Sequence, residues 1–151
     1  MQRRNYRVGA LLIVAVSFSA CARAAVEDVA TKVQPATVEK VPGSDQKRVV
    51  LTAKAAERLG IQTATVRAGA PVAGNTPGTV VDYAAVIYDP QGKASVYTNP
   101  EPLVFVRQDV TVDHIDGDEA FLTDGPPVGT AVVTVGGAEL FGTEFGIGQF
   151  E

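Results

Sequence analysis

Short segments rich in β-branched and aromatic residues, separated by turn sequences, fill the chain from residue 78 onward. Asp116-Gly117 is typical of a two-residue hairpin turn, and Asp89-Pro90-Gln91-Gly92 and Asp124-Gly125-Pro126-Pro127 are further turn sequences. Strands this short and this closely spaced predict an all-β domain, either a small barrel or a sandwich. The predicted strands cover residues 61–66, 79–81, 84–88, 94–98, 103–115, 119–122 and 130–135.

The longest of these segments, residues 103–115, does not alternate evenly along its length. Val110 and Val112 fall on one face of an ideal strand, but the alternation changes phase at Arg107-Gln108. A phase change within a strand predicts a bulge or bend, and we expect one at Arg107-Gln108.

One short helix is predicted before most of the strands. Thr52 is a suitable N-cap, the sequence AKAAERL over Ala53–Leu59 consists of good helix formers, and Gly60 suits the left-handed position after a helix. We expect this helix to cover one opening or edge of a β domain spanning residues 48–143. A further helical turn is expected at residues 138–141.

Residues 1–20 have the composition of a secretory signal peptide. Three arginines precede an apolar stretch over residues 8–18, and small residues follow it. The apolar stretch is too short to cross a bilayer, which takes about 20 apolar residues. We therefore expect the segment to direct export and then to be removed.

Two cleavage sites are compatible with this signal. Phe18-Ser19-Ala20-Cys21 resembles a bacterial lipobox, in which the cysteine receives a lipid, whereas Ala22-Arg23-Ala24 fits ordinary signal cleavage. Because the only cysteine of the chain falls at the end of the apolar stretch, we favour lipid attachment at Cys21. Residues 21–47 are then predicted to be a lipid-attached flexible tether, and residues 144–151 a flexible tail.

Charge and cysteine content exclude several classes of protein. Removing the signal segment takes away three arginines and leaves 10 basic and 17 acidic residues, a net charge of −7. This charge argues against binding to nucleic acid. A single cysteine provides no disulfide framework, so the fold depends on its hydrophobic core.

Residue types that carry catalysis are scarce. A serine or cysteine nucleophile needs a base, and the only histidine, His114, is expected to be a half-exposed strand residue. We therefore predict a protein that is not an enzyme, with no catalytic residue, cofactor or metal site. A weak cation site at the acidic hairpin is the alternative, although turns collect aspartate for backbone reasons. The acidic hairpin comprises Asp113, Asp116, Asp118, Glu119 and Asp124.

Two groups of motifs follow one another along residues 49–81 and 83–143. The first runs from Val49-Val50-Leu51-Thr52 to Gly60-Ile61-Gln62-Thr63, and the second opens with Tyr83-Ala84-Ala85-Val86 and closes with Gly136-Gly137-Ala138-Glu139-Leu140. The motifs between the opening and the close of the second group are Val96-Tyr97, Phe105-Val106-Arg107, Asp116-Gly117-Asp118, Gly125-Pro126-Pro127-Val128-Gly129 and Val132-Val133. In order and spacing the two groups resemble the periplasmic adaptor subunits, or HlyD-like membrane fusion proteins, of resistance-nodulation-division efflux pumps.

The resemblance implies a membrane-proximal β domain of such an adaptor. The chain departs from the family because residues 78–83 leave no room for the lipoyl-like domain and the long helical hairpin. We therefore expect a truncated adaptor-like lipoprotein beside an efflux or secretion transporter, with the transporter or an adaptor subunit as its partner. The alternatives are an extracytoplasmic small-molecule or cation-binding protein and a structural envelope protein. The aromatic candidates for an interface are Tyr83, Tyr88, Tyr97, Phe105 and Phe121.

Overall fold

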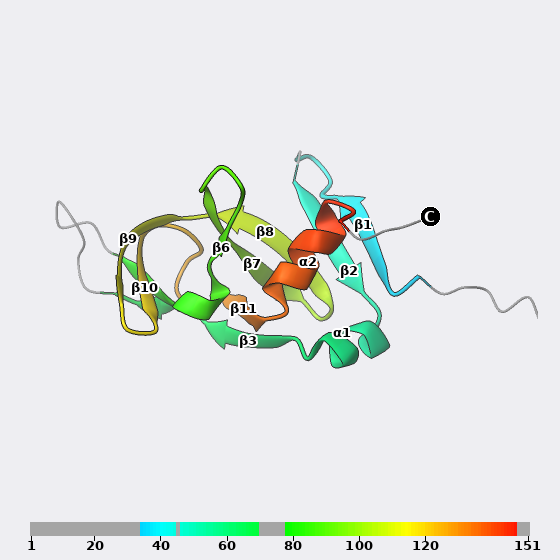
Figure 1. Ribbon diagram of the computed structural model, residues 1–151, viewed down its shortest axis with the longest axis horizontal. Helices are drawn as coiled ribbons and strands as arrows, with labels where there is room; N and C mark the ends of the chain where they lie inside the picture. The colour runs from blue at the N-terminus through cyan, green and yellow to red at the C-terminus, as the bar shows by residue number, and fades with distance from the viewer. Residues whose placement is uncertain (1–33, 45, 70–77, 148–151) are drawn as a thin grey trace, which may run out of the picture. The chain divides into compact units, whose positions relative to one another are not determined.

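The computed structural model describes residues 34–44, 46–69 and 78–147 as two antiparallel sheets with two α-helices and a short 3-10 turn (Figure 1). The predicted all-β class is confirmed. The signal segment and Cys21 lie outside the described residues. In the described part of the chain, no helix has the length and hydropathy needed to cross a bilayer.

The larger sheet has seven strands. Its order is β1-β2-β8-β7-β11-β3, and β6 pairs with β7 beside this path. The neighbouring strands are antiparallel, and β1 and β2 share the longest continuous register, with five consecutive pairs. The strands are β1 (Ala36–Lys40), β2 (Lys47–Leu51), β3 (Gln62–Thr65), β6 (Ile87–Tyr88), β7 (Ala94–Glu101), β8 (Val104–Asp109) and β11 (Ala131–Val135).

The smaller sheet has the order β4-β5-β10-β9. Its outer hairpin turns at Gly117-Asp118, one residue later than the predicted Asp116-Gly117, because Asp116 is still paired with Glu119. Gly117 has a φ of +56°, which glycine adopts readily and a two-residue hairpin turn requires. The register is interrupted between Phe121 and Leu122, which leaves an extra residue, Asp113, on β9. The strands are β4 (Arg67–Ala68), β5 (Thr79–Asp82), β9 (Thr111–Asp116) and β10 (Glu119–Asp124).

The two faces of the larger sheet bury different partners. Successive side chains of a strand point to opposite faces, so Val96 and Val132 pack in one cluster while Tyr97 and Val133 pack in another. The first cluster contains buried residues of the smaller sheet, and the second contains residues of the two helices, α1 (Ala53–Leu59) and α2 (Gly137–Glu144). Figure 1 shows α2 lying across the sheet, where Leu140 is fully buried.

The predicted helix Ala53–Leu59 is confirmed with both caps. The hydroxyl of Thr52 accepts a hydrogen bond from the Ala55 amide at 3.2 Å, and Gly60 takes a left-handed φ of +63°. Ala55 packs into the cluster beneath α2, so this helix covers the sheet and contributes to its core.

The predicted ends of the domain are wrong. Ala36–Lys40, assigned to the flexible tether of residues 21–47, form β1 and pair with all five residues of β2. At the other end, Glu144 is the last residue of α2 and is only 7% exposed, so it does not belong to a flexible tail. The sequence concealed β1, which has a single valine. The helical turn expected at residues 138–141 is present as part of α2, but the helix continues to Glu144, beyond the predicted end of the domain. The β domain therefore extends beyond residues 48–143 on both sides.

The predicted bulge at Arg107-Gln108 is also wrong. The register between β7 and β8 is continuous from Ser95 opposite Asp109 to Thr98 opposite Val106. The break comes at Val110, which is buried and donates its amide to the Ala94 carbonyl at 3.1 Å. The phase change seen in the sequence marks the passage of the chain from the larger sheet to the smaller one.

Replacing Thr52 with alanine should lower the free energy of unfolding by about 1 kcal/mol, because the Ala55 amide loses its side-chain acceptor. Denaturant unfolding monitored by circular dichroism measures this loss. Thr52→Ser keeps the acceptor and should unfold close to the parent chain. Equal destabilisation by both substitutions would contradict a capping role.

Candidate functional site

The aromatic interface candidates divide into buried and exposed residues. Tyr97 and Phe105 are only 1% and 3% exposed and lie in the core, so their prediction as interface anchors is wrong. Tyr83 and Tyr88 are exposed on the 3-10 turn η2 (Tyr83–Ala85) and on β6. Phe121 is half-buried and stacks on His114 with ring centroids 4.4 Å apart.

The acidic hairpin does not gather its carboxylates around one point. Glu119 pairs with Arg67, and Asp113 lies 2.8 Å from Nδ1 of its neighbour His114. The described residues contain no group of three or more His, Cys, Asp or Glu side chains placed to hold a metal ion. The carboxylates of the hairpin are therefore separate surface charges with different partners.

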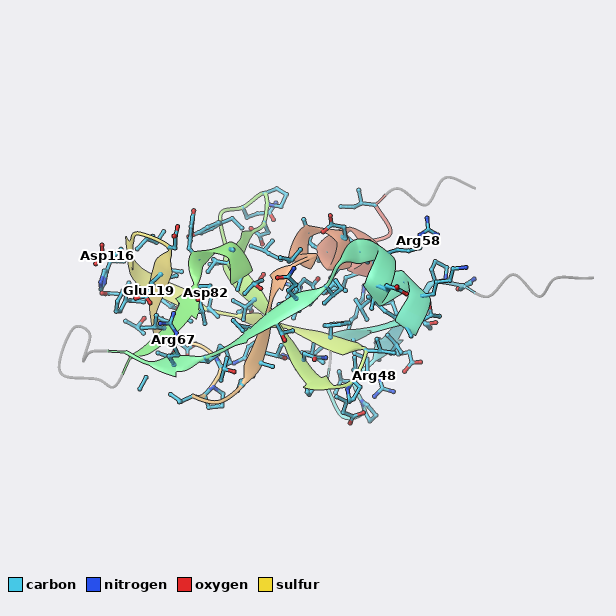
Figure 2. The ribbon with its side chains drawn as sticks, turned by 90° about the horizontal axis from the view of Figure 1, so that it is seen from below. Arg48, Arg58, Arg67, Asp82, Asp116 and Glu119 are labelled. Carbon is cyan, nitrogen blue, oxygen red and sulfur yellow. The ribbon has the colours of Figure 1, made fainter. Side chains whose placement is uncertain are left out.

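Arg67 joins three strands of the smaller sheet. Its Nη1 donates to Glu119 Oε1 at 2.6 Å and its Nη2 to Asp82 Oδ1 at 3.1 Å (Figure 2). The hydrogen bond to Glu119 is the main cause that raises the pKa of Arg67, followed by the charge of the same carboxylate. Because the three side chains are exposed, the cluster contributes little to stability.

The buried end of α2 holds a polar cluster of Glu144, Tyr97 and Arg107. Glu144 Oε2 accepts a hydrogen bond from the Tyr97 hydroxyl at 2.6 Å and another from Arg107 Nε at 3.1 Å. Burial raises the pKa of Tyr97, and the hydrogen bond to Glu144 raises it further. Burial by itself would lower the pKa of Arg107, but its bonds to Glu144 raise it. The phenol stays protonated and the guanidinium stays charged, so this cluster fixes α2 to β7 and β8.

This buried cluster places Phe145 on the surface. Phe145 follows α2 directly, is 50% exposed and packs against Phe141 with ring centroids 4.6 Å apart. The Arg107 guanidinium lies 5.3 Å from the centroid of the Phe145 ring and Lys47 Nζ lies 5.8 Å from it, distances typical of cation–π contacts. Two cations thus lie close to the ring while half of the residue faces solvent.

Two open hollows flank the Phe145 ring, and Arg107 and Phe145 line both of them. Their volumes are about 330 and 320 Å³. We call the two hollows and the ring between them the Phe145 surface. The first hollow is completed by Ser44, Gln46, Lys47, Asp109 and Glu144, and the second by Asp89, Pro90, Gln91, Phe141 and Ile147.

The Phe145 surface has the composition of a protein-binding site. Interfaces are enriched in aromatic residues and arginine at the centre and have polar residues at the rim. Here Phe145 and Arg107 are central, and the rim carries amide, hydroxyl and charged groups. Both carboxylates in the first hollow are paired with Arg107, which leaves no free acid or base pair suited to proton transfer there.

The sequence did not reveal this site. Phe145 and Ile147 lie in the segment predicted to be a flexible tail. Arg107 is part of a predicted bulge and of the adaptor-like motif Phe105-Val106-Arg107, and neither prediction makes it a site residue. The spacing of Phe141 and Phe145, four residues apart on one helical face, is the signal that could have indicated it.

No known protein family, curated protein or solved structure matches the chain. The nature of the Phe145 surface therefore rests on its own residues and geometry.

Replacing Tyr97 with phenylalanine should change how stability depends on alkaline pH. An unfolded tyrosine loses its proton near pH 10, whereas the raised pKa keeps Tyr97 protonated in the folded chain. The unfolded chain then binds fewer protons than the folded chain, so the free energy of unfolding falls as pH rises above about 10. In Tyr97→Phe the free energy of unfolding should not show the decrease that Tyr97 causes above pH 10. At neutral pH it should be lower than that of the parent chain by about 1–3 kcal/mol.

Chemical denaturation at intervals from pH 7 to pH 11 measures the difference. Tyr88→Phe removes an exposed phenol and should keep the slope of the parent chain. If the free energy of unfolding depends on pH in the same way for Tyr97→Phe and for the parent chain, Tyr97 has the same pKa in the folded and unfolded states, which would contradict the prediction.

Proposed function

We propose that this protein is a non-catalytic, membrane-tethered accessory lipoprotein that binds an efflux or secretion transporter through the Phe145 surface. The observation that carries the proposal is Phe145 itself. It is a half-exposed aromatic ring, held in place by Arg107 and flanked by two open hollows. A rigid aromatic anchor of this kind loses little conformational entropy when a partner covers it.

The family resemblance gives the kind of partner. The closing motif of the adaptor-like segment, Gly136-Gly137-Ala138-Glu139-Leu140, supplies the first half of α2, the helix that leads to Phe145. In the adaptors that the chain resembles, the corresponding β domain packs against an inner-membrane pump. A transporter subunit is therefore the partner we propose for the Phe145 surface.

A passive binding role also agrees with the chemistry of the interior. Every buried side-chain nitrogen or oxygen among the described residues has a hydrogen-bond partner. Tyr97, the most strongly perturbed of the described titratable groups, is held in its neutral form by burial and by Glu144. A phenol with a raised pKa is a poor nucleophile and is already donating its proton to a carboxylate.

The lipid proposed for Cys21 would keep the domain near the membrane. Residues 22–35 separate Cys21 from β1, and a chain of that length spans at most about 50 Å when fully extended. A partner within this distance of the bilayer surface is consistent with a membrane transporter.

Replacing Cys21 with serine should move the protein from the membrane fraction to the soluble fraction, because serine cannot receive the thioether-linked lipid. Cell fractionation measures the shift, and mass spectrometry of the N-terminal peptide of the parent chain should find a lipidated Cys21. An unmodified N-terminus near Ala25 in the parent chain would contradict the lipid anchor.

Replacing Phe145 with serine should lower recovery of a transporter subunit tenfold or more, because a central aromatic anchor contributes about 2 kcal/mol or more to binding. The measurement is affinity purification of the full-length protein from its native membrane, with quantitative mass spectrometry of co-purifying proteins. Val128→Ser is the matched control, since Val128 is 58% exposed and lines neither hollow.

Val128→Ser should retain the partner at the level of the parent chain. Equal recovery with Phe145→Ser would place the contact elsewhere. If the parent chain recovers no membrane protein, the transporter-associated function is wrong.

A further inference from the structure

The outer edge of the smaller sheet, β9, has a strand on one side only. It pairs with β10, and no other described strand continues the sheet beyond it (Figure 1). Residues 113–116 are all exposed. An uncovered strand edge offers backbone N–H and C=O groups that can pair with another extended chain.

The hairpin geometry shows where these backbone groups are free to pair. Asp116 and Glu119 close the two-residue turn and so form a hydrogen-bonded pair. In an antiparallel ladder such pairs alternate with pairs whose N–H and C=O groups point outward. The next pair is Ile115 with Ala120, which directs the Ile115 backbone away from β10.

Ile115 also extends the core to the surface. Val81, Ala120 and Ile115 lie side by side across β5, β10 and β9, and they share one face of the sheet. Val81 and Ala120 are buried in the core between the sheets, but Ile115 is 44% exposed. An added strand could cover Ile115 with an apolar side chain and prolong that row.

Charge is distributed unevenly between this sheet and the rest of the chain. Figure 2 shows Asp82, Asp116 and Glu119 at one end, with Arg67 the only labelled basic residue beside them. Arg67 is engaged by Asp82 and Glu119, so the excess negative charge is carried by β9, the turn after it and the end of β10. The smaller sheet with its turn has six carboxylates (Asp82, Asp113, Asp116, Asp118, Glu119, Asp124) and one arginine, whereas the other described residues have seven acidic and seven basic side chains.

This imbalance indicates the chemistry of the occupant. A second copy of the chain pairing through β9 would place Asp113 and Asp116 near their counterparts, which like-charge repulsion disfavours. An anionic membrane surface would be repelled for the same reason. A basic segment would be attracted, and rim charges of this kind also speed its association.

We propose that β9 binds an extended, basic segment of a partner protein, which adds to the smaller sheet as a fifth strand. Alternating residues of the segment would cover Ile115 and face Asp116. This site is separate from the Phe145 surface and extends the proposed function by giving the domain two binding surfaces.

The test titrates the full-length, ¹⁵N-labelled chain in detergent micelles with a synthetic peptide. The probe is an acetylated and amidated hexapeptide of alternating valine and lysine. Amide chemical-shift changes should concentrate on residues 113–116 and weaken as salt is added. A hexapeptide of alternating valine and glutamate should not bind, and N-methylation of the lysine peptide backbone should abolish binding, because methylated amides cannot pair with the strand edge.

Replacing both Asp113 and Asp116 with asparagine should weaken binding of the lysine peptide about tenfold. Glu57→Gln with Glu101→Gln removes the same charge from exposed positions outside the smaller sheet, and it should bind the peptide as the parent chain does. Phe145→Ser should also bind normally, so a failure of the Phe145 surface does not affect this test.

Three results would overturn the proposal. The first is undetectable binding, or shifts that map outside β9. The second is equal binding by the N-methylated peptide, which would indicate attraction by charge without strand addition. The third is a concentration-dependent shift of residues 113–116 in the peptide-free chain, which would make a second copy the occupant.

Discussion

The position of α2 on the larger sheet depends on the hydrogen bonds that the buried carboxylate of Glu144 accepts. This carboxylate lies at the end of α2, where Tyr97 of β7 and Arg107 of β8 both donate to it. Removing one partner from a buried charged group costs several kcal/mol, because the remaining charge stays out of water. The helix is therefore fixed to the sheet at its last residue as well as through Leu140. Phe145 comes next in the chain, so its place on the surface follows from that buried contact.

The larger sheet separates the two proposed binding surfaces. One face of β7 and β11 packs against the helices and supports Phe145, and the other face packs against the smaller sheet that carries β9. This division explains why β7 is buried over five consecutive residues instead of alternate ones. A strand covered on both faces has no side exposed to solvent. The elements packed on its two faces present different chemistry, with an aromatic ring close to two cations on one side and an acidic strand edge on the other.

Features governed by neighbours in the sequence were predicted well. The N-cap at Thr52 and the left-handed Gly60 depend on a few adjacent residues, and both are present. The two-residue hairpin turn is also present, at Gly117-Asp118, one residue later than predicted. The errors concern elements whose stability comes from distant partners. β1 exists because β2 pairs with it, and Glu144 is buried because Tyr97 and Arg107 lie beneath it. The phase change at Arg107 was real, but its cause was a change of sheet at Val110.

The sequence by itself determined the all-β class, the capped helix, the turns and the excess of acidic residues, because each depends on local backbone preference or on composition. It also contains the segment predicted to direct export, the cysteine proposed to carry a lipid and the motifs that resemble those of adaptors. Only the tertiary structure decided which aromatic residues are exposed, since burial depends on what packs against a strand from elsewhere in the chain. It also decided where the charges gather. The acidic side chains are spread over more than forty positions of sequence, from Asp82 to Asp124, and they belong to one sheet because β5, β10 and β9 pair with one another.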